Sequence, residues 1–137
     1  IRYMKKDALP RRRQDGSQAT VWPRRRPGDG KIDWGLSVAD LYNFIRALTT
    51  PFPGAFFVLS QREIKVKHCG YLCHPNMEPA GQVLGAYCAH SSGDKGMAVF
   101  AKDGILIFTI LEDEQGDIIK GSRLVEFARQ HKGELLQ

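Results

Sequence analysis

The sequence lacks the features that mark exported or membrane-spanning proteins. Its 137 residues include only three cysteines, an odd number that favours neither a disulfide framework nor an exported compartment. No unbroken apolar run is longer than that of residues 55–59, which is far below the roughly 20 residues that cross a bilayer, and no apolar stretch follows the basic N-terminus. Internal repeats and low-complexity tracts are also absent. We therefore expect no membrane contact and a cytoplasmic location.

Length and composition indicate a single folded domain. With 42% hydrophobic and 26% charged side chains, a chain of 137 residues can bury a core without metal or disulfide staples. The first residue is Ile1 rather than Met. We therefore expect the chain to be a segment of a longer protein.

The net charge of +5 is unevenly distributed. Residues 1–31 carry ten basic and three acidic side chains, a net charge of +7, whereas residues 32–137 carry ten basic and twelve acidic ones, a net charge of −2. Prolines and glycines interrupt residues 1–31, so we expect a basic arm that runs extended across a surface. Such an arm is either a contact for nucleic acid or another phosphate-bearing polyanion, or a solvated linker. The candidate contact residues are Arg11, Arg12, Arg13, Arg24, Arg25, Arg26 and Lys31.

Residues 37–48 carry the strongest helix signal. Val38, Leu41, Ile45 and Leu48 recur at the spacing of one helical face, and Ser37 is a suitable N-cap. Prolines from position 51 onward prevent the helix from continuing. A second, shorter helix is expected over residues 121–131.

Five short segments are rich in β-branched and aromatic residues, as strands are. Residues 54–59 and 63–67 are expected to form a hairpin that turns at Ser60 and Gln61, and residues 97–101 and 105–111 flank a two-residue turn at Asp103-Gly104. Residues 81–88 supply the fifth strand, and residues 91–96 form a polar loop. The pattern predicts a mainly β fold with helices (α+β), a small closed antiparallel barrel of the oligonucleotide/oligosaccharide-binding (OB) type. The predicted boundaries are 1–31 for the arm and 32–137 for the barrel domain.

Several short motifs follow one another in a specific order. They are RQDGSQAT at 13–20, RRRPGDGKIDW at 24–34, NFIRA at 43–47, PFPGAF at 51–56, GQVL at 81–84, DGILI at 103–107 and GSRL at 121–124. This ordered set resembles the linker and the OB-like C-terminal domain of the methionyl-tRNA formyltransferase family, which includes amino-sugar formyltransferases. The resemblance covers the chain from about residue 10 to its end.

The resemblance implies a parent enzyme that transfers a formyl group from 10-formyltetrahydrofolate to an amine through an N-terminal Rossmann-like domain. The family's catalytic Asn, His-Pro-Ser and Asp motifs do not occur here, because His74-Pro75 is followed by Asn76 and no Asn precedes it at the family's spacing. We therefore expect this segment to be non-catalytic and to bind no cofactor itself. Structural roles in turning the chain and anchoring the linker are expected for the motif residues Asp33, Trp34, Arg46, Pro53 and Gly54.

Three functions stay open for the domain and its partners. In the first, the parent enzyme formylates an amino sugar carried on a nucleotide, which suits a barrel with a net charge of −2. In the second, the domain contacts methionyl initiator tRNA, which the basic arm favours. The third is a stand-alone polyanion-binding module. We favour the first, with the parent's catalytic domain as partner and homo-oligomerisation left open.

The cysteines and aromatic residues have simpler interpretations. Cys69, Cys73 and Cys88 lack the paired spacing of a structural zinc site, so we expect no metal, and nothing in the sequence places a histidine beside a thiolate. The strand aromatics are expected to pack in the core rather than to stack on bases. They are Phe56, Phe57, Tyr71, Tyr87, Phe100 and Phe108.

Overall fold

The computed structural model describes residues 13–24, 26–49, 51–75, 79–88 and 95–137. Within them, six strands form one antiparallel sheet in the order β1-β2-β5-β4-β3, with β6 paired to β5. The strands are β1 (Ala55–Leu59), β2 (Arg62–Cys73), β3 (Val83–Cys88), β4 (Lys95–Ala101), β5 (Gly104–Glu112) and β6 (Ile118–Lys120). The helices are α1 (Val38–Ala47), α2 (Ser122–Gln130) and the short 3₁₀ helices η2 (Gly16–Gln18) and η3 (Pro27–Gly30). The predicted α+β fold of the OB-like type is confirmed.

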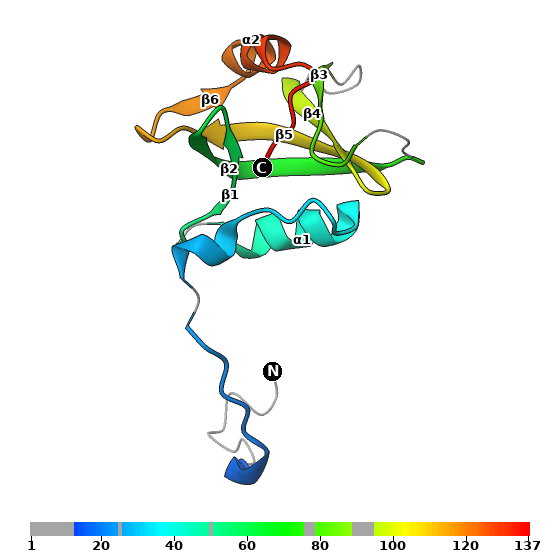
Figure 1. Cartoon of the computed structure of the whole chain (residues 1–137). Coiled ribbons are helices and arrows are strands. Elements are labelled where there is room, and N and C mark those ends of the chain that lie inside the picture. The colour runs from blue at the N-terminus through cyan, green and yellow to red at the C-terminus, as the bar shows by residue number, and fades with distance from the viewer. Residues whose placement is uncertain (1–12, 25, 50, 76–78, 89–94) are drawn as a thin grey trace, which may run out of the picture.

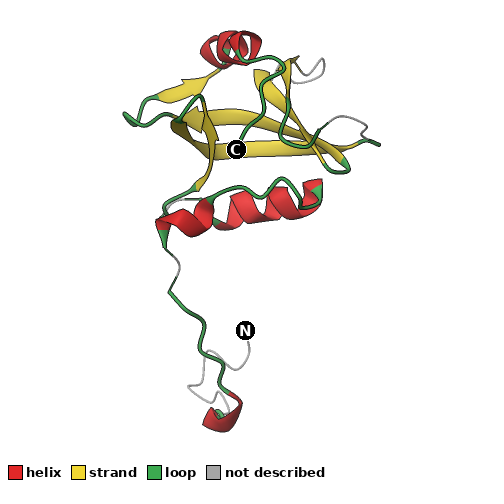
Figure 2. Ribbon diagram, viewed as in Figure 1, coloured by secondary structure: helices red, strands yellow, loops and turns green. Residues whose placement is uncertain are grey.

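The two α-helices lie on opposite sides of the coiled sheet (Figure 2). Helix α1 packs against β2 and β5, while α2 packs against β3 and β4. The positions from 38 to 48 that were predicted to face inward on α1 are all buried, as are Leu124 and Ala128 of α2. Among the described residues, no helix is long and apolar enough to cross a membrane.

The start of α1 is fixed by hydrogen bonds to its first backbone N–H groups. Ser37 is the N-cap, as predicted, and its hydroxyl accepts from the Asp40 N–H at 3.2 Å. The Val38 N–H donates to the Asp103 carboxylate at 2.7 Å, although the two residues are far apart in the sequence. The β4–β5 turn that contains Asp103 therefore helps to place the helix on the sheet.

The β1–β2 hairpin turns at the predicted residues, but β2 is much longer than predicted. Ser60 and Gln61 adopt positive φ angles of 50° and 66°, as the tight turns of hairpins require. The predicted end of β2 at Lys67 is wrong, because the strand continues to Cys73. It continues because β5 pairs with it over nearly its whole length, through register shifts between Val66 and Cys69.

The predicted turn at Asp103-Gly104 is displaced by one residue. Gly104 pairs with Ala101 as the first residue of β5, so the turn consists of Lys102 and Asp103. A β-carbon at position 104 would collide with the Leu72 carbonyl oxygen and the Val38 side chain. The glycine therefore serves the close packing of α1, β2 and β5 rather than the turn.

The loop predicted at 91–96 is also partly wrong. Residues 91–94 lie outside the described residues, whereas Lys95 and Gly96 belong to β4. A β-carbon at Gly96 would lie 2.6 Å from the Phe108 carbonyl oxygen, so a glycine is needed where the start of β4 lies close to the backbone of β5. The three-residue strand β6, which sequence reasoning missed, pairs with the far end of β5.

The C-terminal tail, residues 133–137, closes the barrel. On one side Val58 of β1 exchanges backbone hydrogen bonds with Gln137, at 2.7 and 2.9 Å. On the other side the Leu136 N–H donates to the Gly81 carbonyl at 3.0 Å, and the Val83 N–H donates to the Glu134 carbonyl at 2.9 Å. Figure 1 shows the C-terminus lying beside β1. The tail thus covers the edges of both outer strands.

The core contains two of the strand aromatics. Phe57 of β1 and Phe108 of β5 are fully buried and stack with a centroid distance of 5.4 Å, so their predicted core role is confirmed. The other strand aromatics are partly or largely accessible at the surface. These are Phe56, Tyr71, Tyr87 and Phe100.

Candidate functional site

Residues 13–24 of the basic arm extend away from the barrel (Figure 1). Residues 13–24 are exposed throughout, so this part of the arm, which was predicted to run extended across a surface, does not pack on the barrel. Arg13, Arg24 and Arg26 are all exposed. The other candidate contact residues of the arm, Arg11, Arg12 and Arg25, lie outside the described residues.

Residues 26–32, which we call the docked linker, are held against β1 by a close backbone contact. Gly30 is buried, and a β-carbon there would collide with the Gly54 carbonyl oxygen. Gly54 follows the exposed Pro53 and has a φ of +100°, a conformation that favours glycine. Two glycines far apart in the sequence therefore let two backbones approach where the linker meets the barrel.

Hydrogen bonds complete the docked linker. The Arg26 N–H donates to the Asp29 carboxylate at 2.7 Å, which closes the single turn of η3. Lys31 forms a parallel bridge with Phe56 of β1, and the Ile32 N–H donates to the Phe56 carbonyl oxygen at 2.9 Å. The linker is thus an added edge segment on β1, and its direction is set by the sheet.

Asp33 and Trp34 continue this attachment. The Asp33 carboxylate accepts the Gly35 N–H at 3.0 Å, which forms a local turn before α1. The Trp34 ring packs on the core and against Gly81, where a β-carbon would lie 3.1 Å from the ring. Its buried Nε1 has no hydrogen-bond partner among the described residues. Trp34 therefore ties the linker to the barrel, while Asp33 shapes the turn that leads into α1.

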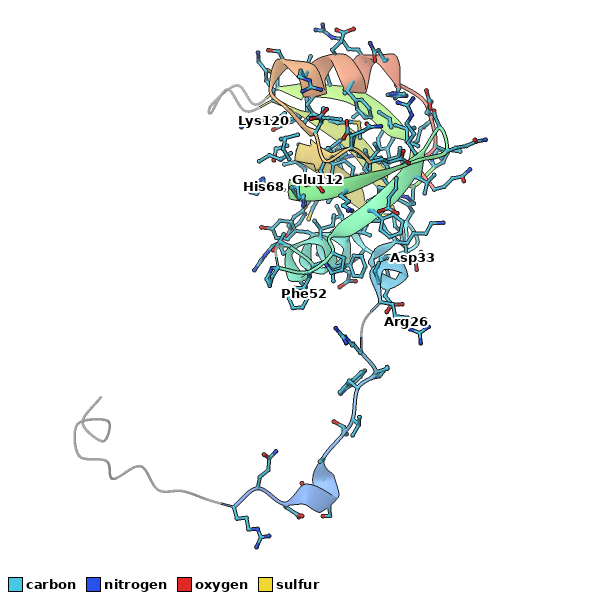
Figure 3. All side chains as sticks on the ribbon, turned by 90° about the vertical axis from the view of Figure 1, so that its left-hand side faces the viewer. Arg26, Asp33, Phe52, His68, Glu112 and Lys120 are labelled. Atoms are coloured by element: carbon cyan, nitrogen blue, oxygen red, sulfur yellow. The ribbon has the colours of Figure 1, made fainter. Side chains whose placement is uncertain are left out.

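A hollow of about 1050 Å³, the linker hollow, lies between the linker and the loop after α1. Trp22 and Phe52 contribute large apolar surfaces and are 85% and 56% exposed. Arg24 and Arg26 supply charge from the linker side; Figure 3 shows Arg26 and Phe52 at the lower part of the domain. The hollow combines apolar surface with guanidinium groups, a mixture typical of contact surfaces.

Arg46 lies in a second hollow, which sequence reasoning did not find. This hollow, the α1–β2 pocket, has a volume of about 310 Å³. Arg46 comes from α1, and Lys67 and His68 come from β2, so only the packing of the helix on the sheet brings the three together. The sequence assigned Arg46 a structural role and gave Lys67 and His68 none in binding. The pocket is lined by Tyr42, Ile45, Arg46, Thr49, Lys67, His68 and Cys69.

Cys69, at the base of the α1–β2 pocket, is not equipped for nucleophilic chemistry. Burial raises the pKa of the thiol to about 12, and the nearby Arg46 charge lowers it only in part. The thiol is therefore protonated at neutral pH. All three cysteines are unpaired, and Cys73 and Cys88 are exposed. In the part of the chain that the structure describes, no cluster of metal-ligating side chains is found.

A third hollow, of about 370 Å³, opens between the β1–β2 turn and α2. Its apolar base includes Ile64 and Phe127, while its rim carries Arg62 together with the acidic Asp113 and Glu114. Charges of both signs therefore face the opening. This favours neither an anion nor a cation as ligand.

Deleting residues 1–24 is expected to abolish weak, salt-sensitive binding of RNA or heparin by this chain. The reason is that residues 1–24 carry seven basic and two acidic side chains, a net charge of +5, whereas residues 25–137 carry thirteen of each and have no net charge. Cutting after residue 24 leaves the docked linker intact. Affinity measured over a series of salt concentrations tests this, and undiminished binding by the shortened chain at moderate salt would locate the nucleic-acid surface on the barrel.

Comparison with known families gives one match. A model of the family described as formyl transferase, C-terminal domain, matches residues 25–129. The matched region begins at the docked linker and ends within α2. It therefore covers all six strands, while most of the arm and the closing tail fall outside it.

Proposed function

Because the chain belongs to the formyltransferase C-terminal domain family, we propose that it is the non-catalytic module of a 10-formyltetrahydrofolate-dependent formyltransferase. The match over residues 25–129 is the observation that carries this proposal, since the family joins this domain to an N-terminal catalytic domain. We place the parent enzyme in the cytoplasm. The three unpaired thiols support that location.

The role of the module is to hold and orient the catalytic domain that precedes it in the parent enzyme. The docked linker leaves the barrel from a fixed position on β1, at the hydrogen bond between Ile32 and Phe56. A catalytic domain joined through such a short attachment stays at high effective concentration beside the linker hollow. We assign no step of formyl transfer to this chain, because its described hollows do not combine the Asn, His and Asp that the family uses. The formyl donor and the reacting amine belong to the catalytic domain.

The acceptor we propose is an amino sugar linked to a nucleotide. A domain that grips tRNA needs a broad basic face, because each neutralised phosphate calls for a Lys or Arg. Residues 32–137 carry a net charge of −2. Two of their lysines, Lys65 and Lys67, already share the Glu112 carboxylate, at 3.9 and 2.9 Å. The barrel therefore has no net excess of positive charge with which to hold a long polyanion.

Methionyl initiator tRNA is the second candidate acceptor. One observation favours it: the arm has a net charge of +7, and its described arginines Arg13 and Arg24 are exposed. In that case the arm, rather than the barrel, would lie along the tRNA phosphates.

The test compares both acceptors with the full-length parent enzyme and 10-formyltetrahydrofolate. We expect formylation of a nucleotide-linked amino sugar and only background formylation of methionyl initiator tRNA, with reactions lacking the formyl donor as the control. Efficient formylation of the tRNA, together with none of the amino sugar, would reverse the choice of acceptor. Absence of formyl transfer to either acceptor would contradict the assignment to a formyltransferase.

A further inference from the structure

The α1–β2 pocket gathers positive charge without an acidic side chain in its wall. Arg46 and Lys67 line it together with His68, and none of its seven lining residues is Asp or Glu. The hollow near α2 differs, because Asp113 and Glu114 stand at its rim. Of these two hollows, only the α1–β2 pocket has the charge that an anion requires.

The nearest acidic group does not cancel this charge. Glu112 lies 2.9 Å from the Lys67 ammonium and 3.9 Å from that of Lys65, so one carboxylate serves two lysines and the group keeps a net charge of +1. Arg46 has no carboxylate within ion-pair distance among the described residues. It raises the charge around the pocket to +2. The protonated Cys69 thiol adds no negative charge.

The Arg46 guanidinium is held in place by an aromatic ring. Its Cζ lies 5.2 Å from the centroid of the Tyr42 ring, and that ring in turn packs against Tyr71 at 5.0 Å. A cation–π contact of this kind does not use the guanidinium N–H groups, which can therefore donate hydrogen bonds to phosphoryl oxygens.

The negative end of the α1 dipole is partly screened beside the pocket. Carbonyl groups at a helix C-terminus repel anions when they are unpaired. Here the Arg46 carbonyl oxygen accepts the Thr49 hydroxyl at 2.9 Å and the Thr49 N–H at 3.5 Å. On the sheet side, His68 Nδ1 is fixed 2.6 Å from the Thr109 hydroxyl. His68 is exposed and lies on the flank seen in Figure 3.

We propose that the α1–β2 pocket binds a diphosphate group, with Arg46 and Lys67 as the principal contacts and His68 beside them in the pocket wall. Its volume of about 310 Å³ lies at the lower end of the roughly 300–1,000 Å³ range of small-molecule sites. One compact pocket on a barrel of net negative charge suits a small ligand better than a long polyanion. That the diphosphate is carried by a nucleoside rests on the proposed function; the anion site itself does not.

The test is a titration of the purified chain, followed by NMR and calorimetry in a buffer free of phosphate. The probes are inorganic pyrophosphate and uridine diphosphate. We expect saturable binding, with chemical-shift changes concentrated at residues 42–49 and 67–69, and weaker binding at higher salt. Arg46→Gln and Lys67→Gln are each expected to raise the Kd by about tenfold, because each removes one charge-assisted contact.

Lys102→Gln is the matched control, since it removes one exposed positive charge from the β4–β5 turn, away from the pocket. It is expected to leave the Kd within about twofold, because exposed charges beyond a Debye length are screened. Equal weakening by Lys102→Gln, or no saturable binding of either probe, would overturn the site. Binding of pyrophosphate alone would overturn its assignment to a nucleotide.

Binding of a short RNA without terminal phosphates tests whether the pocket prefers a nucleic acid to a nucleoside diphosphate. Tighter binding of this RNA than of uridine diphosphate, with changes at the same pocket residues, would overturn the proposed diphosphate ligand. All these measurements use the purified chain alone and do not depend on formyl transfer. Failure of the anion site is therefore distinguishable from failure of the proposed function.

Discussion

Removal of residues 134–137 is expected to unfold the domain. Leu136 in this tail is only 4% exposed, and truncating a buried leucine costs about 2–5 kcal/mol. The tail also makes backbone hydrogen bonds to both Val58 and Gly81, each worth about 1 kcal/mol. The combined loss approaches the whole stability of a small domain, about 5–15 kcal/mol. It would also expose the edges of β1 and β3.

Two adjacent leucines allow a matched comparison. Leu136→Ala should lower the free energy of unfolding by about 2–5 kcal/mol, whereas Leu135→Ala, at a position 56% exposed, should change it by less than about 0.5 kcal/mol. Urea unfolding followed by circular dichroism measures both values, and far-UV spectra report on the shortened chain. A cooperative transition in that chain, at the same urea concentration as the full chain, would show that the barrel does not need its tail.

Gly30→Ala is expected to destabilise the domain and to release the linker from β1. The new β-carbon would collide with the Gly54 carbonyl oxygen, and because this atom is backbone it cannot turn aside as a flexible side chain could. Overpacking of this kind costs about 1–3 kcal/mol. The chain can avoid the clash only by moving the linker away, which breaks the hydrogen bond between Ile32 and Phe56.

Gly28→Ala is the control for this substitution. It lies in the same 3₁₀ turn, but a β-carbon there meets nothing within 4 Å. Thermal unfolding of both variants, with the amide resonance of Ile32 as a local probe, separates the two effects. Equal stability of the two variants, with an unchanged Ile32 resonance, would mean that the contact between Gly30 and Gly54 does not hold the linker.

The elements predicted well from the sequence are those whose signal is local. Helix α1 followed from its apolar spacing and from Ser37, and the β1–β2 turn followed from the residues between two strand-like segments. The second half of β2 could not be found in this way, because residues 68–73 lack apolar alternation and owe their conformation to pairing with β5. The same holds for β6 and for the tail, whose partners are distant in sequence. Glycines at 96 and 104 suggested a loop and a turn, but they are required by close strand contacts.

The residues of the candidate site also differ in whether their sequence signal is local. Motifs around Asp33, Trp34 and Gly54 marked the place where the linker meets the barrel, because their residue types already suggest turns and anchoring. The cluster of Arg46 and Lys67 carries no sequence signal, since a helix and a strand contribute one residue each. An outward-facing lysine on a strand is common, and its importance depends on which helix packs beside it.

Amide hydrogen exchange of Ile32 tests most directly whether the domain fixes the direction of its linker. The Ile32 N–H donates to the Phe56 carbonyl oxygen at 2.9 Å, whereas Val21 in the arm is 96% exposed. Amides in strand pairs exchange only when the structure opens, so protection reports the stability of the pairing. We predict that Ile32 exchanges as slowly as Val58 within β1. Exchange of Ile32 as fast as that of Val21 would contradict the account, because the linker would then be free of the barrel.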